Sequence, residues 1–325
     1  MASQTSQLKH LQPIVSSFCL FKLILVQSVI HLKSHLAVFG TIFFVLALPL
    51  SLLLLCLISS SRPMQSQIFL IQTLSVHSSI PFESWEMWKR ARQHAISLFR
   101  LKLIYFVPCS ILSLVTAVTT VSSVSASYNH RPVALRTTFS AVRENWYPPI
   151  LTSICSYVGL LAYSCIPKIL ATMLGGGALG LIAILIGSGF EMYLAAVVSI
   201  GIVISIAEKV GGWPAIIAGW ELMEEKRICG LAVAMVLVLS CNVIEWRMES
   251  ILEDGKKMVW ARATGWERIE VKGKLGWWEW PVLLMVYAIA VVWGYAVSTI
   301  FYCECKKRQV TSREEEEEGD DSQNL

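Results

Sequence analysis

Six long apolar stretches constrain this chain more than any other feature. Five of them contain no Asp, Glu, Lys or Arg, and the sixth contains only Glu191. A helix needs roughly 17–25 mainly apolar residues to cross about 30 Å of hydrocarbon. We therefore predict membrane spans at 37–58, 103–125, 147–167, 178–206, 228–244 and 281–302.

The composition agrees with a chain that lies mostly in lipid. Of its 325 residues, 55% are hydrophobic and only 15% are charged, whereas a soluble domain has about 25% charged residues. The mean hydropathy is +0.59. These values argue against a soluble enzyme, a disordered chain and a nucleic-acid-binding domain. The predicted fold class is all-α, a polytopic membrane bundle of about six helices.

The region 169–207 is ambiguous because it is long for one span and short for two. Gly175, Gly176 and Gly177 form a run that suits a tight turn. We therefore predict one long or tilted helix over 178–206, entered through this turn, and leave a broken pair of helices as the alternative.

Short amphipathic stretches precede the first, third and fifth spans and predict helices that lie in the headgroup plane. The arrangement resembles three helical hairpins, each introduced by an interfacial helix. Residues 83–102 depart from this pattern as a further amphipathic stretch before the second span. The apolar faces consist of Ile14, Phe18, Phe21, Leu25 and Leu32; of Leu135, Phe139, Val142 and Trp146; and of Ile216, Trp220 and Met223.

Six spans place both termini on one side of the membrane. Lys and Arg are equally frequent on the two sides, so the positive-inside rule does not orient the chain. The basic run 306–308 follows the last span and favours an anionic cytosolic leaflet. We predict a cytosolic amphipathic segment at 1–35, a membrane domain at 36–302, and a disordered, basic-then-acidic cytosolic tail at 303–325. The membrane is an endomembrane or the plasma membrane.

Glu191 is the main candidate functional residue because it lies deep in a predicted span. An ionised carboxylate costs on the order of 2.5–3.5 kcal/mol at that depth, so such groups often mark ion or proton pathways. Three interpretations remain. Glu191 bonds a neighbouring hydroxyl or amide such as Ser153, Tyr157 or Asn242, it serves transport, or the chain turns near 187–189 and leaves it at an interface.

Small residues around this span predict close helix packing or homo-oligomerisation. The spacing of Gly176 and Gly180 is an example.

Three cysteines and one serine are candidate modification sites. Cys229, Cys303 and Cys305 lie near basic residues at span ends, a setting that suits S-palmitoylation, although unmodified thiols are the alternative. Ser312 lies three residues before Glu315 in an acidic run and suits an acid-directed kinase.

Enzyme signatures are lacking in the sequence. The six histidines do not pair with carboxylates or cysteines at metal-ligand spacing, and no Gly-x-Ser-x-Gly motif occurs. We expect no catalytic residue, no metal and no cofactor. The expected partners are the lipid bilayer and other membrane proteins or further copies of the chain, with no nucleic acid.

Three stretches together resemble a known family. Residues 124–141 read VSASYNHRPVALRTTFSA, residues 192–230 read MYLAAVVSIGIVISIAEKVGGWPAIIAGWELMEEKRICG, and residues 298–306 read STIFYCECK. With Leu48-Pro49-Leu50-Ser51, they resemble a plant family of uncharacterised six-helix multi-pass membrane proteins. The resemblance implies cytosolic termini and hairpins with interfacial helices, and it supplies no catalytic residue. The loop 245–280 and the acidic tail depart from that pattern.

These observations predict an integral multi-pass membrane protein that is not an enzyme and that organises membrane or partner proteins through its interfacial helices. The alternative is a small transporter or channel that uses Glu191.

Overall fold

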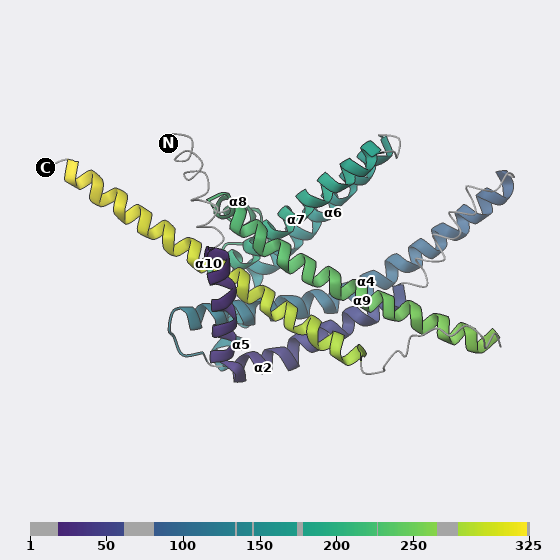
Figure 1. The fold of residues 1–325 in the computed structure, drawn as a ribbon, viewed down its shortest axis with the longest axis horizontal. Helices are drawn as coiled ribbons and strands as arrows, with labels where there is room; N and C mark the ends of the chain where they lie inside the picture. The colour runs from purple at the N-terminus through teal and green to yellow at the C-terminus, as the bar shows by residue number, and fades with distance from the viewer. Residues whose placement is uncertain are drawn as a thin grey trace, which may run out of the picture. The chain divides into compact units, whose positions relative to one another are not determined.

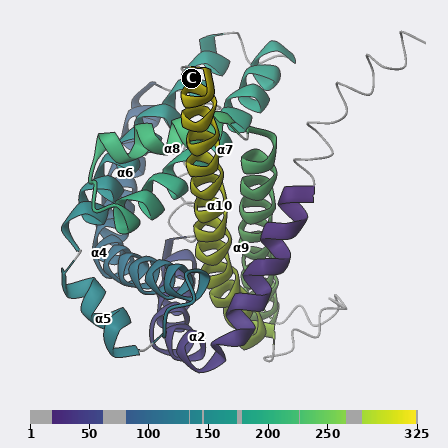
Figure 2. The same ribbon diagram turned by 90° about the vertical axis from the view of Figure 1, so that its left-hand side faces the viewer.

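The computed structural model is built from α-helices, and the residues it describes contain no strand (Figure 1, Figure 2). These residues are 19–61, 81–133, 135–144, 146–173, 178–225, 227–264 and 279–323. Helices occupy 19–34, α2 (Leu36–Ile42), the π-helical turn η1 (Phe43–Ala47), 48–61, α4 (Pro81–Tyr128), α5 (Leu135–Glu144), α6 (Tyr147–Met173), α7 (Ala178–Ala207), α8 (Trp213–Glu225), α9 (Arg227–Thr264) and α10 (Glu279–Gln323). The predicted all-α fold class is confirmed.

Six helical segments are long and apolar enough to cross a membrane, and each overlaps a predicted span. They are Leu36–Ser61, Arg92–Tyr128, Tyr147–Ala171, Ala178–Ala207, Arg227–Ile244 and Trp280–Gln309. α7 runs unbroken from Ala178 to Ala207, so the ambiguous region contains one long helix.

The chain divides into two compact units. The first comprises 1–42, 114–240 and 290–325, and the second comprises 43–113 and 241–289. The candidate site and the helix contacts described below lie within the first unit.

α6 and α7 pack against each other and run side by side as a hairpin (Figure 1). The approach is closest where Gly187 meets Pro167, because a Cβ at Gly187 would lie 2.5 Å from the Pro167 ring. The outer surfaces of both helices are apolar and exposed, as a lipid-facing surface requires. They carry Ile154, Val158, Leu161 and Ile166 on α6, and Leu179, Leu181, Leu185 and Ile186 on α7.

α8 packs closely on α7 through two glycines. A Cβ at Gly219 would lie 2.9 Å from the Val197 carbonyl oxygen and 3.0 Å from the Gly201 nitrogen. A Cβ at Gly201 would lie 3.2 Å from the Ala215 carbonyl oxygen. The two backbones therefore touch where they cross, in the manner of small-residue helix interfaces.

Pro108 and Pro167 lie inside α4 and α6, whereas several other prolines lie where a helix tolerates them. Pro148, Pro149, Pro214 and Pro281 lie in the first turns of their helices, where the missing N–H would have no helical partner. The π-helical turn η1 ends two residues before Pro49, which cannot donate to a carbonyl in the preceding turn.

Two amphipathic elements, the helix 19–34 and α5, leave part of their apolar surface exposed. The helix 19–34 buries Leu20, Ile24 and Ser28, whereas Val26 and Ile30 are exposed. The residues predicted as its apolar face either lie outside the described part of the chain (Ile14, Phe18) or are half-buried (Phe21, Leu25, Leu32).

α5 likewise turns Thr138 inward and leaves Phe139 40% exposed. The Thr138 and Ser123 hydroxyls hydrogen-bond each other at 3.2 Å. In water, the apolar face of a helix turns toward the protein interior. Beside lipid, polar groups must find their hydrogen-bond partners within the protein, so the polar face can turn inward and the apolar face can contact lipid. The inward-facing hydroxyls of Ser28 and Thr138 fit the second case.

Three boundaries also differ from the predicted ones. Residues 83–102 are part of α4, continuous with the second span, and α9 extends beyond its span to Thr264. The predicted disordered tail is helical through Gln323, because α10 continues without a break. Lys, Arg, Gln and Glu have good helix propensity, and a span that is already helical removes the cost of nucleation.

Candidate functional site

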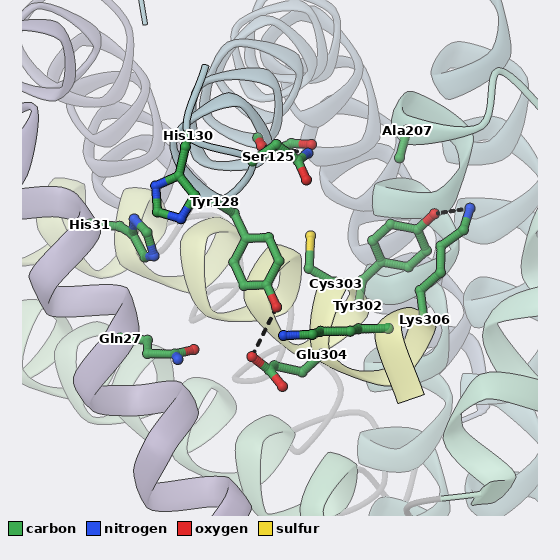
Figure 3. A pocket seen from close by; sticks show the side chains of 12 residues that line it. Gln27, His31, Ser125, Tyr128, His130, Ala207, Tyr302, Cys303, Glu304 and Lys306 are labelled. Carbon is green, nitrogen blue, oxygen red and sulfur yellow. Dashed lines mark hydrogen bonds between the residues drawn. The ribbon is translucent and has the colours of Figure 1, made fainter. Parts of the chain in front are cut away.

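A polar pocket of about 870 Å³ lies where α4 and α7 end and α10 passes, facing the helix 19–34 (Figure 3). Tyr128 is the last residue of α4 and Ala207 the last of α7. Polar side chains dominate the wall. The lining residues are Gln27, His31, Ser125, Tyr128, Asn129, His130, Ala207, Tyr302, Cys303, Glu304, Lys306 and Lys307.

The helix 19–34 is attached to α10 by a partly buried hydrogen bond. The Trp293 indole N–H donates to the Ser28 hydroxyl at 3.0 Å, and that hydroxyl donates to the Leu25 carbonyl at 2.7 Å. This contact explains a tryptophan in the middle of a span, where an interfacial role does not apply. It also directs Gln27 and His31 toward the pocket.

Tyr128 and His31 connect the end of α4 to its neighbours. The Tyr128 hydroxyl donates to Glu304 of α10 at 3.0 Å, and His31 Nδ1 lies 2.9 Å from the Ser127 hydroxyl. Burial lowers the pKa of His31, and the nearby His130 and His35 lower it further. His31 is therefore a neutral hydrogen-bonding group near pH 7.

Glu208 closes the end of α7 against α10. Its Oε1 accepts hydrogen bonds from the Lys306 ammonium at 2.6 Å and from the Tyr302 hydroxyl at 2.7 Å. Lys306 also donates to the Tyr302 hydroxyl oxygen at 3.0 Å (Figure 3). The Lys306 hydrogen bond lowers the pKa of Glu208 against the opposing effect of burial, so this carboxylate neutralises Lys306 at pH 7.

The turn after α4 holds His130 in an unusual backbone conformation. The N–H of Arg131 donates to the Ala126 carbonyl and that of His130 to the Ser127 carbonyl, which is the Schellman pattern. His130 occupies the left-handed position with φ 54°. Glycine is the usual residue there, yet here the position holds an imidazole that lines the pocket.

The turn after α7 is attached to α6 and α5. The Gly212 N–H donates to the Thr152 hydroxyl at 2.9 Å, and Lys209 pairs with Glu144 at 3.3 Å. Lys209 has φ 60°, so this turn also places a non-glycine residue in the left-handed region. These contacts fix the chain that follows Glu208.

Glu191 lies apart from the pocket. It is half-buried on α7 and lines neither the pocket nor a second cavity of about 10 Å³ beside Ser199 and Gly230. Two aromatic contacts lie near Glu191: the ring of Tyr163 contacts that of Phe190, and the ring of Tyr193 contacts that of Trp220.

The candidate modification sites differ in how exposed their side chains are. Cys229 and Cys305 are buried, with 1% and 2% of their surface exposed. Cys303 is half-buried and lines the pocket. Ser312 falls within α10, but its side chain lies outside the described part of the structure. Modification at these positions stays a prediction.

Apart from Cys303 and the basic residues Lys306 and Lys307, sequence reasoning assigned no role to the pocket residues. Several of them nevertheless come from the stretches that carried the family resemblance, with Tyr128 in the first, Ala207 in the second, and Tyr302, Glu304 and Lys306 in the third. A usable signal was present, since Glu208 and Glu304 are acids at the ends of apolar spans and each is followed closely by a lysine. Within the described ranges, no three His, Cys, Asp or Glu side chains are grouped to hold a metal ion.

Residues 16–314 match a family described as a domain of unknown function (DUF8558), and the chain belongs to that family. No curated protein and no solved structure matches the chain. The six apolar helices are consistent with a membrane protein.

Proposed function

We propose that this chain is a non-catalytic, multi-pass membrane protein that organises the surrounding lipid through its interfacial helices. The narrower assignment to a plant family of six-helix membrane proteins, in an endomembrane or the plasma membrane, is part of this proposal.

The outward face of α8 carries the proposal. Its inner face packs on α7, while Trp213, Ile217 and Trp220 form an exposed row at helical spacing, with 60%, 46% and 39% of their surface exposed. Such a row, on a helix anchored to a bundle, suits burial at the boundary between headgroups and acyl chains. Trp146 and Phe139 extend the same kind of surface near α5.

Ile217→Glu tests this role, with Ile217→Met as the matched control. Ile217 is the better position because Trp220 also packs edge-on against Tyr193 at 5.2 Å. In nanodiscs that contain photoactivatable phospholipid, we expect Ile217→Glu to abolish most lipid crosslinks to α8 and Ile217→Met to preserve them. Equal crosslinking of the three proteins would contradict the proposal.

Transport through Glu191 is the alternative function. Its carboxylate lies within a candidate span, but it lines neither cavity. A transporter predicts solute or ion flux in liposomes that Glu191→Gln removes without changing the melting temperature.

A further inference from the structure

We propose that the polar pocket binds a small zwitterion in which a primary ammonium lies close to an anionic group, as in the headgroup of an aminophospholipid. This inference rests on the proposed membrane role, because it places the pocket at the depth of the headgroups.

The position of the pocket supports this depth. Its wall is formed at the ends of the second and fourth candidate spans and by Tyr302–Lys307 in the last turns of the sixth. In a six-span chain, these even-numbered spans all leave the membrane on the same side. The volume lies within the roughly 300–1,000 Å³ range of small-molecule sites.

The side that faces the helix 19–34 offers hydrogen-bond acceptors. The Gln27 amide oxygen is buried and has no hydrogen-bond partner among the described residues, which is costly unless a bound group donates to it. Figure 3 shows the Gln27 amide directed toward Glu304. Glu304 accepts one hydrogen bond from Tyr128 through Oε1, which leaves its second oxygen for another donor. A primary ammonium has three N–H donors and suits both acceptors, whereas a quaternary ammonium has none.

The pocket wall also carries donor and cationic groups. Lys307, Asn129 and His130 are among the lining residues. The left-handed conformation of His130 costs free energy in a residue other than glycine, and it places an imidazole in the pocket wall. An anionic group near His130 and Lys307 would complete the zwitterion.

Wild-type protein supplies the first test. In native mass spectrometry of protein extracted from mixed vesicles, we expect at least tenfold preferential retention of phosphatidylethanolamine over phosphatidylcholine. Isothermal titration with free phosphoethanolamine identifies the source of the zwitterion, since binding of the free compound points to a soluble ligand and retention of the lipid alone points to a headgroup. Equal retention of both lipids without binding of phosphoethanolamine would overturn the proposal, and it would leave the α8 crosslinking result unaffected.

Two variants test the acceptors. Glu304→Gln removes the charge and Gln27→Leu removes the unpartnered oxygen, and each should weaken the preference about tenfold. If both retain it while folded, the ammonium is not held there.

A pair of glycine substitutions tests His130. His130→Gly and Lys209→Gly each remove the backbone strain of a non-glycine residue in the left-handed conformation. Both should therefore leave the melting temperature unchanged or raise it. Only His130→Gly should weaken ligand binding, because Lys209 does not line the pocket. Unchanged binding by His130→Gly would remove His130 from the site.

Discussion

Glu208 is the residue whose ionisation most directly links two helices of the first unit. Its pKa is lowered below the ordinary value of 4.5, chiefly by the Lys306 hydrogen bond. The unfolded chain therefore takes up the proton first, so the stabilisation is complete above pH 4.5 and is lost as the pH falls below it. Partial exposure limits the effect to about 1 kcal/mol or less.

Glu208→Gln should lower the melting temperature at pH 7, and the difference from the wild type should shrink as the pH falls below 4.5, as measured by thermal unfolding in detergent. Glu221→Gln is the control, because Glu221 is exposed on α8 and has no ion pair among the described residues. A temperature difference that persists unchanged at pH 3.5 would contradict this account of the Glu208 contact.

Ser28 gives a second prediction at the residue scale. Ser28→Ala leaves the Trp293 N–H without its acceptor, and an unpaired buried donor costs about 1–3 kcal/mol. Ser205→Ala is a matched control, because Ser205 is also fully buried but its hydroxyl bonds only to Ile202 of its own helix. Thermal unfolding should therefore show the larger loss for Ser28→Ala, and equal losses would exclude a stabilising role for the Trp293 contact.

Individual polar contacts were the hardest features to predict from the sequence. Tyr128 and Glu304 are 176 residues apart and Ser28 and Trp293 are 265 apart, so no local pattern links them. Glu191 could be selected as a candidate from the sequence, because the cost of burying a carboxylate follows from its position in the middle of a span. Glu208 lies at a span end, where a carboxylate has no such cost and its partner depends on packing.

At the scale of elements, the crossing of α7 and α8 depends on the absence of a side chain at Gly219. Gly219→Ala places a methyl group against backbone atoms that cannot rotate away, and such overpacking costs about 1–3 kcal/mol. Gly189→Ala, in α7 with nothing within 4 Å of the added methyl, should stabilise the helix by roughly 0.5–1 kcal/mol. Thermal unfolding checks both signs, and stabilisation by Gly219→Ala would contradict the close crossing.

The positions of helices were predictable because hydrophobic length is a property of consecutive residues. All six predicted spans overlap candidate spans of the structure. The buried faces of the amphipathic stretches were less predictable. Periodicity separates the apolar from the polar face, as it does for α5, but it does not tell whether protein or lipid covers the apolar one.

At the scale of the whole molecule, an even number of crossings places both termini in the same compartment. Complementation reporters fused to the first and last residues should both assemble with a partner fragment expressed in the cytosol, since the basic run 306–308 favours that side. Signal from only one terminus would require an odd number of spans.

We expect the exposed apolar surfaces of the helices to lie in lipid. Spin labels introduced as unnatural amino acids at Leu185 of α7 and Leu161 of α6 test it most directly, with Lys209 as the water-exposed reference. In reconstituted bilayers, we predict that collisions with oxygen exceed those with a water-soluble nickel complex at Leu185 and Leu161, and that the order reverses at Lys209. Nickel collisions as frequent at Leu185 as at Lys209 would contradict the account.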